Sequence, residues 1–126
     1  MKRVLASVTL AAALLGGGSA AATPCRGDVP PVGSTVRGPV LHVLDGQTLC
    51  VALSPSPTDW APLRLADAPP AGTRSLLMAV TFAQDVDCTV VEGEAAEAVA
   101  VCAIRGRRIG ELARSPQAAR RAKAWR

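Results

Sequence analysis

Short, mostly apolar runs bounded by turn-forming residues dominate the chain from residue 40 onward. Runs of this kind, rich in β-forming residues, are typical of strands. The runs that predict strands are residues 40–44, 48–53, 60–66, 88–92 and 98–104. Asp45-Gly46 separates the first two runs, and this dipeptide is a strong hairpin signal because both residues suit a tight turn. Composition also predicts turns at residues 92–94 and 105–106 and a loop over 54–59.

Other stretches follow the period of a helix. Thr73 is a suitable N-cap for a helix over residues 74–85. The residues expected to pack that helix against the strands are Leu76, Leu77, Val80 and Phe82 or Ala83. Near the C-terminus, residues 109–113 predict a short helix. Ser115-Pro116 then opens a last helix that runs to Trp125.

The order of these elements is three strands, a helix, two strands and a helical end. A helix between the third and fourth strands of a five-stranded set is the arrangement of an OB-type barrel. The predicted fold is therefore mainly β with α, a five-stranded OB-fold barrel followed by a C-terminal helix. It occupies residues 38–126, after a proline-rich extended lead-in over residues 23–37.

Residues 1–22 have the pattern of a secretory signal peptide. A basic start precedes an apolar run over residues 4–15, and Ala20-Ala21-Ala22 offers the small residues that signal peptidase needs. A transmembrane anchor is the alternative, but this run is shorter than the ~20 residues that span a bilayer. We expect an exported protein, periplasmic or secreted, that begins near Thr23 and has no membrane contact once the peptide is removed.

All four cysteines follow this peptide, at Cys25, Cys50, Cys88 and Cys102. An even number of cysteines in an oxidising compartment favours disulfides. The absence of C-x-x-C spacing and the single His argue against a zinc site. Free buried thiols are the alternative, because Cys is also a common core residue. Since Cys88 and Cys102 fall on neighbouring hairpin strands, we favour the pairs Cys88–Cys102 and Cys25–Cys50 over the other two connectivities.

Charge is unevenly distributed along the chain. Residues 23–104 carry four arginines and nine acids, a net charge of −5, whereas residues 105–126 carry eight basic residues and one acid, a net charge of +7. This basic end predicts weak contact with nucleic acid or another polyanion. The residues expected to provide it are Arg107, Arg108, Arg120, Arg121 and Lys123. The alternative is that these side chains only solvate a terminal helix.

The opposite side of that last helix is expected to dock on the barrel, through Ala118, Ala119, Ala122 and Trp125. The chain contains only two Trp, one Phe and no Tyr. Stacking of bases on aromatic side chains, which nucleic-acid binders commonly use, therefore contributes little here.

Two stretches resemble the signatures of the staphylococcal-nuclease-like (thermonuclease) family. They are Val43-Leu44-Asp45-Gly46-Gln47-Thr48-Leu49 and Arg64-Leu65-Ala66-Asp67-Ala68-Pro69, and the ending from Ser115 to Trp125 is similar to that family's last helix. The resemblance covers about residues 38–126 and implies an OB-fold. It also implies hydrolysis of nucleic-acid phosphodiesters with one Ca²⁺. That chemistry needs carboxylates for the metal, a Glu that activates water and two arginines that clamp the phosphate.

The resemblance carries over only some of these residues. The matches are Asp45 and Asp67, as remnants of the metal site, and Arg64, as a remnant of the arginine pair. Gln47 replaces a ligand carboxylate, and Pro70 stands where the catalytic Glu belongs. Glu97 lies where the second arginine is expected, which reverses the charge at that position.

We therefore expect a thermonuclease-like protein whose nuclease site is largely lost, acting as a non-catalytic binding or structural module. No cofactor is expected, and Ca²⁺ only if nuclease activity persists. The alternative is a weak or altered Ca²⁺-dependent phosphodiesterase that retains Asp67 and Arg64. A different hydrolytic site, built from Asp45, Asp67 and the acids near Glu92, is a further alternative. His42 is expected to be solvated, and the sequence indicates no particular protein partner.

Overall fold

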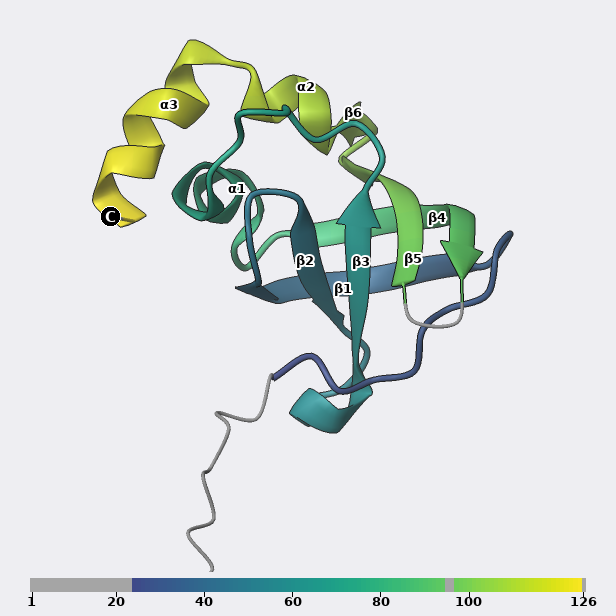
Figure 1. The fold of residues 1–126 in the computed structure, drawn as a ribbon. Coiled ribbons are helices and arrows are strands. Elements are labelled where there is room, and N and C mark those ends of the chain that lie inside the picture. Colours follow the sequence, from purple (N-terminus) through teal and green to yellow (C-terminus); the bar gives the residue numbers. More distant parts are fainter. Residues whose placement is uncertain (1–23, 95–96, 126) are drawn as a thin grey trace, which may run out of the picture.

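The computed structural model describes residues 24–94 and 97–125, so the predicted signal peptide lies outside the described part of the chain. Within it, one sheet curls into a barrel and the helices gather at one end (Figure 1). The strands are β1 (Thr35–Val43), β2 (Thr48–Ala52), β3 (Trp60–Leu65), β4 (Asp85–Glu94), β5 (Glu97–Ile104) and β6 (Arg107–Arg108). The helices are α1 (Arg74–Thr81), α2 (Ile109–Ala113) and α3 (Pro116–Ala122), with 3₁₀ turns η1 (Pro57–Asp59) and η2 (Lys123–Trp125).

Closure of the barrel depends on one parallel pairing. The strand order is β3-β2-β1-β4-β5-β6, and β3 also pairs with β5. Arg64 lies opposite Val99 and Leu65 opposite Ala100 in this parallel contact, whereas the other strand pairs are antiparallel. The result is a closed five-stranded barrel with α1 between β3 and β4 and a helix at the C-terminal end. The predicted OB-like fold is confirmed.

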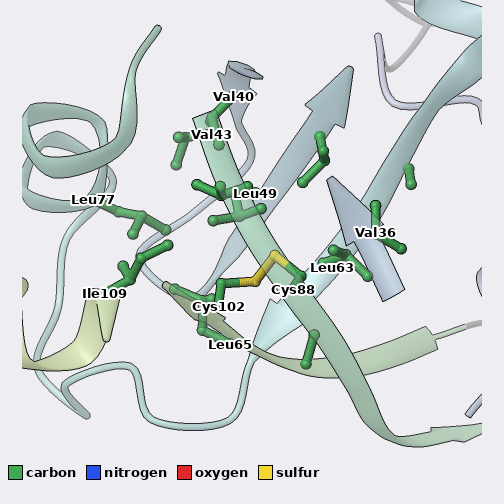
Figure 2. Close-up of a cluster of buried hydrophobic side chains, with 14 of the residues drawn as sticks. Val36, Val40, Val43, Leu49, Leu63, Leu65, Leu77, Cys88, Cys102 and Ile109 are labelled. Carbon is green, nitrogen blue, oxygen red and sulfur yellow. A yellow bond between two sulfur atoms is a disulfide. The ribbon is translucent and has the colours of Figure 1, made fainter. Parts of the chain in front are cut away.

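Aliphatic side chains at alternating positions fill the barrel (Figure 2). In β1 the alternation changes phase, because a register shift between Val40 and His42 adds one residue to this strand. Val40 and Val43 can therefore both be fully buried although they are three positions apart. Leu49 of β2 and Leu63 of β3 complete this layer of the core.

Helix α1 closes the end of the barrel where β3 stops. The Thr73 hydroxyl accepts a hydrogen bond from the Leu76 N–H at 3.1 Å, so the predicted N-cap is confirmed. Leu77, Met78 and Thr81 are the buried residues of α1. The buried Thr81 hydroxyl is satisfied by the carbonyl of Leu77, to which it donates at 2.8 Å.

The predicted helix over residues 74–85 is too long, because α1 ends at Thr81. Ala83 takes a left-handed conformation with φ of 61°, and its N–H donates to the Val40 carbonyl at 2.8 Å. Pairing with β1 thus replaces the last predicted turn. Phe82 and Ala83 are exposed, and neither belongs to the hydrophobic core cluster or to the hydrophobic residues packed against it.

The C-terminal helices dock differently from the prediction. Ala118 and Ala122 are buried as expected, but α3 packs on α1 and not on the strands. Ala119 is exposed, and the Trp125 ring lies 5.1 Å from the ring of Phe82. The predicted single helix to Trp125 ends as an α-helix at Ala122 and continues as the 3₁₀ turn η2.

The bounds of β1 and β4 differ most from those of the predicted strands. β1 begins at Thr35, inside the predicted lead-in, because residues 35–39 pair with β4. β4 continues to Glu94, which lies opposite Glu97, so the turn predicted at residues 92–94 is wrong. The reversal instead falls between these two glutamates. Its central residues, 95–96, lie outside the described ranges.

The rest of the lead-in crosses the barrel end opposite α1 (Figure 1). The Gly27 N–H donates to the Trp60 carbonyl at 2.9 Å, at the start of β3. Farther along, the Gly33 N–H donates to the Val90 carbonyl of β4 at 2.8 Å. Val29 between them packs against the hydrophobic core. This segment therefore bridges β3 and β4 and helps to cover the core.

Both favoured disulfides are present. Cys88 and Cys102 lie directly opposite each other on β4 and β5, and their bond is part of the core cluster (Figure 2). Cys25 is bonded to Cys50 and ties the lead-in to β2. The two predicted pairings are confirmed.

Candidate functional site

Arg64, the remnant of the predicted arginine pair, forms an ion pair with Glu97. Its Nη1 lies 3.6 Å from the Glu97 Oε1, and both side chains are about half exposed. The contact follows from the barrel closure, because the parallel register sets Arg64 opposite Val99, two residues beyond Glu97. The residue that replaces the second arginine of the resemblance thus neutralises the first.

Asp45 has a structural role in the β1–β2 turn. Its Oδ1 accepts hydrogen bonds from the backbone N–H groups of Gln47 and Thr48, both at 2.8 Å. This is the local pattern for which Asp is favoured in turns. One oxygen of the carboxylate is therefore engaged by the loop itself.

Asp67 lies just beyond the end of β3, so the alternation of strand residues does not fix its direction. Its carboxylate packs against Gly110 of α2, where an added Cβ would lie 2.6 Å from the Asp67 Cγ and Oδ2. Its Oδ1 is buried and has no hydrogen-bond partner among the described residues. Arg114 bonds nearby, but it donates to the backbone carbonyls of Asp67 and Gly110, at 3.1 and 2.8 Å.

The carried-over acids do not form a metal site of the expected kind. No hydrogen bond or ion pair of the described residues links Asp45, Arg64 and Asp67 to one another. Within the described ranges, no three acid, His or Cys side chains gather closely enough to hold a metal ion. Calcium takes six to eight oxygen ligands. One turn-forming carboxylate and one carboxylate packed against a helix do not fit that requirement.

Gln47 and Pro70, the two remaining positions of the resemblance, carry no charge. The Gln47 carbonyl accepts the Leu65 N–H at 2.8 Å, which holds the β1–β2 turn against the end of β3. Pro70 is exposed in the loop that leads to α1 and carries no group that transfers a proton. Neither residue supplies a charge to this end of the barrel.

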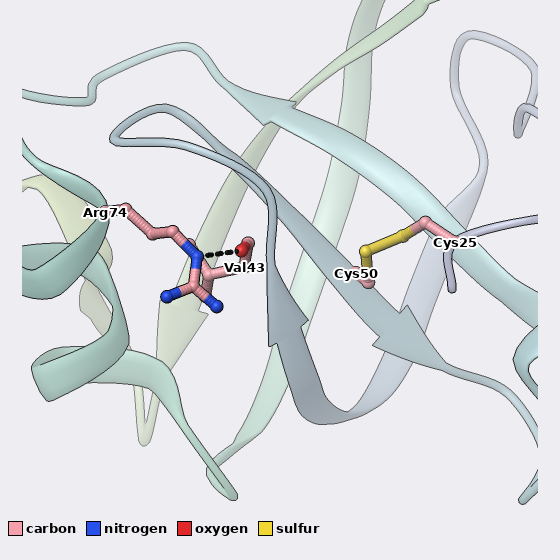
Figure 3. The surroundings of a disulfide bond; sticks show 4 residues. All are labelled: Cys25, Val43, Cys50 and Arg74. Atoms are coloured by element: carbon pink, nitrogen blue, oxygen red, sulfur yellow. Dashed lines mark hydrogen bonds between the residues drawn. A yellow bond between two sulfur atoms is a disulfide. The ribbon is translucent and has the colours of Figure 1, made fainter. Parts of the chain in front are cut away.

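His42 lies on β1 beside the positive charge of Arg74. Burial lowers the pKa of His42 below its ordinary value, and the Arg74 guanidinium lowers it further. Arg74 itself is held in place, because its Nε donates to the Val43 carbonyl at 2.8 Å (Figure 3). The His42 side chain is partly buried rather than fully solvated, which differs from the prediction.

The outer face of β2 is partly covered. Leu49 and Val51 belong to the core cluster, so Cys50 between them points away from the barrel interior. It is nevertheless fully buried, because Cys25 is bonded to it and brings the lead-in over this strand (Figure 3). In OB-folds the β2–β3 face and the neighbouring loops commonly bind nucleic acid. Part of that face is occupied here by the chain itself.

The basic C-terminal end is exposed as predicted. The exposed basic residues of this predicted surface are Arg107, Arg108, Arg120, Arg121 and Lys123. None of them forms an ion pair with a side chain that the structure describes. They come from three elements, β6, α3 and η2, which lie on the side of the barrel where the helices gather (Figure 1).

Sequence reasoning counted Arg105 in the basic end but did not name it among the residues that contact a polyanion. Arg105 and Gly106 form the β5–β6 turn, and both have positive φ, 50° and 79°, as a type I′ turn requires. The turn places Arg105 beside a cleft that Arg107 and Arg121 also line. The available signal was the turn at residues 105–106, but the approach of α3 to it depends on contacts with α1.

No helix among the described residues combines the length and apolar character that crossing a membrane requires. The two disulfides are typical of proteins that fold in an oxidising compartment. Comparison of the chain with protein-family models, with curated proteins and with solved structures finds no significant match.

Proposed function

We propose that this protein is an exported, non-catalytic binding module that contacts polyanions through its basic C-terminal end. In this proposal it is a thermonuclease-like protein whose nuclease site has been lost. The observation that carries the loss of catalysis is the ion pair between Arg64 and Glu97, at 3.6 Å. It joins the only retained arginine of the expected clamp to an acid that repels phosphate.

The missing groups account for a large loss of rate. A general base contributes about 10²–10⁴-fold, and Pro70 cannot serve as one. A preorganised donor to the developing charge contributes about 10²–10³-fold, and Glu97 replaces it with a negative charge. These factors do not multiply cleanly within one catalytic unit, yet either alone leaves little activity.

The polyanion contact rests on charge that is both exposed and unneutralised. Basic residues of β6 and α3 have no ion pair within the described part of the chain, whereas Arg37 and Arg64 of the barrel each have an acidic partner. Phosphate contacts of this kind give binding without sequence preference. With three or four phosphates engaged, the logarithm of affinity should fall against the logarithm of salt with a slope of about −3.

The first test is plasmid nicking by the disulfide-bonded protein in millimolar Ca²⁺. We expect no cleavage above the buffer control, and no rise in melting temperature on adding Ca²⁺. The matched variant is Asp67→Ala, which removes a carboxylate of the resemblance. Cleavage that requires Ca²⁺ and disappears in this variant would establish the phosphodiesterase alternative.

The second test is titration of single-stranded DNA at ~20 mM salt, where we expect micromolar affinity. Changing Arg120 and Lys123 to Gln together should weaken binding severalfold and reduce the salt slope, because phosphate contacts are lost. Arg26→Gln is the control, since Arg26 is an exposed arginine on the lead-in at the other end of the barrel. Equal weakening by this control, or no binding at ~20 mM salt, would refute the proposal.

A further inference from the structure

A cleft of about 350 Å³ lies between the helices and the β5–β6 turn. Arg105 lines it from the turn, Arg107 from β6 and Arg121 from α3, so three guanidinium groups border one space. Val80 of α1 and Leu112 of α2 provide an apolar part of the wall. Its volume falls within the ~300–1,000 Å³ typical of small-ligand sites.

The charge of this cleft is uncompensated. None of its lining residues is acidic, and none of the three arginines forms an ion pair with a described side chain. Arg105 Nη2 lies 3.5 Å from the Gln84 Oε1, a neutral acceptor on the same cleft wall. Acids do occur on the other side of Arg105, at Asp85 and Asp87, where they border a separate cleft.

Those two acids leave the arginine cleft positive. Asp87 is paired with Arg37 at 3.2 Å. Asp85 lines the separate cleft on the other side of Arg105 and does not line the arginine cleft. An anion that enters between Arg105, Arg107 and Arg121 therefore meets three positive groups and no carboxylate of the cleft wall.

We propose that this cleft binds a phosphate monoester, such as the terminal phosphate of a nucleic-acid strand or a free mononucleotide. The inference rests on the proposed polyanion function and names the chemical group that the basic end recognises. A phosphate monoester carries about −1.5 to −2 charges at pH 7 and three acceptor oxygens. Guanidinium groups match such oxygens with paired N–H donors, and here they approach from three different elements.

Charge and shape favour the monoester over other anions. A carboxylate carries one charge and would leave much of the cleft's positive charge uncompensated. An internal phosphodiester also carries one charge, and its chain continues on both sides of the phosphorus. A monoester can enter end-on, with its three free oxygens among the arginines and its carbon part against Val80 and Leu112.

The test compares two single-stranded DNA oligomers of the same sequence, with and without a 5′-phosphate, binding to the disulfide-bonded protein at ~20 mM salt. We expect the phosphorylated oligomer to bind about tenfold more tightly, the worth of one additional charge-assisted hydrogen-bonded contact. Arg105→Asn should bring this ratio close to one. Asn-Gly is the favoured pair for a type I′ turn, so this variant removes the charge while preserving the turn.

A second variant in the cleft and a control variant outside it test whether the preference for the phosphorylated oligomer comes from the cleft. Arg121→Gln should also lower the ratio, because Arg121 lines the cleft from α3. Arg26→Gln removes an equal charge at an exposed residue of the lead-in that does not line the cleft, so the ratio should remain about tenfold. Unchanged melting temperatures show that the variants are folded.

Competition by a mononucleotide 5′-phosphate distinguishes the two sources of the group. Competition that Arg105→Asn abolishes identifies a free monoester as a ligand, and no competition with a preserved tenfold ratio identifies the strand end. A ratio near one in the unaltered protein overturns the inference, as does a ratio or a competition that Arg105→Asn leaves unchanged. In these cases, binding of the unphosphorylated oligomer still supports the proposed function, whereas no binding of either oligomer refutes both.

Discussion

The arginines of the barrel and of α1 are held differently from those of the C-terminal helical end, which comprises the β5–β6 turn, β6, α2, α3 and η2. Arg64 of β3 is paired with Glu97, and Arg74, the first residue of α1, is bonded to a backbone carbonyl of β1. At the helical end, Arg105, Arg107 and Arg121 border a cleft with no acid on its wall. Arg64, the one arginine that the resemblance carries over, is thus paired with an acid, whereas the three cleft arginines have no ion pair among the described side chains.

The difference shows that the closed barrel does not depend on unpaired arginines. The closing contact of β3 with β5 depends on backbone pairing and on an aliphatic interior, and neither requires a phosphate-binding arginine. Basic side chains with no ion pair among the described residues lie instead on the elements that follow β5. If this comparison is right, substitutions near β3 change stability, and substitutions at the helical end change binding.

The largest effect on stability is expected on the outer face of β2. Changing Cys25 and Cys50 to Ala together opens a loop with a sequence separation of 25. The chain-entropy estimate for such a loop predicts a loss of about 3 kcal/mol in the free energy of unfolding. Urea denaturation measures it. DNA binding at the helical end should not change, and a loss of binding in the folded variant would contradict the separation of the two regions.

The next effect concerns the packing of Asp67 against α2. Gly110→Ala adds a Cβ 2.6 Å from the Asp67 Cγ and closer still to the Asp67 backbone oxygen, so the backbone at Asp67 or the helix must shift. Overpacking of this kind costs about 1–3 kcal/mol, of which the better helix propensity of Ala recovers up to about 1 kcal/mol. Thermal or urea unfolding measures the net loss. Glu111→Ala, at the exposed neighbouring position, should change stability by less than about 0.5 kcal/mol.

Local signals predicted the elements that depend on neighbouring residues. The Asp45 turn, the Thr73 and Ser115 caps and the order of strands and helices follow from composition and spacing over a few positions. The Cys88–Cys102 disulfide followed from the expected strand neighbours, and the Cys25–Cys50 disulfide joins the two cysteines that remain. These features could be predicted from the sequence because each depends on residues of one hairpin, one helix end or one pair of neighbouring segments.

Features decided by distant contacts were not predicted. The end of α1 depends on Ala83 bonding to Val40, and Phe82 contacts Trp125, a residue far away in the sequence. The Arg64–Glu97 pair required the register of the parallel contact between β3 and β5. The arginine cleft forms because α3 docks on α1. The alanine pattern of the sequence predicts instead that this helix docks on the barrel.

A smaller effect is expected for the ion pair on β3. Arg64 and Glu97 are about half exposed, and exposed pairs are typically worth 0.2–1 kcal/mol. A double-mutant cycle with Arg64→Gln and Glu97→Gln, measured by urea denaturation, should therefore give a coupling free energy of that size, and added salt should reduce it. Glu97→Gln alone should not produce nicking activity, because Pro70 still supplies no base. A coupling of zero at low salt would mean that Arg64 is not neutralised by Glu97.

The smallest effect is expected in the pH dependence of stability, and it reports on His42, which lies beside Arg74. His42 is the only His in the chain, and burial together with the Arg74 charge lowers its pKa in the folded state. The unfolded chain then binds a proton more readily than the folded one near pH 6.5 and below. The stability that the folded protein gains while His42 is neutral is complete above that pH. It is lost as the pH falls through 6.5 toward the lower pKa of the folded state.

Melting temperatures from pH 7.5 to 5 should therefore fall further for the unaltered protein than for His42→Gln, in which this contribution is absent. Parallel curves for the two proteins would contradict the assignment, and a curve that falls further for His42→Gln would require a folded-state pKa raised by an acid rather than lowered by Arg74.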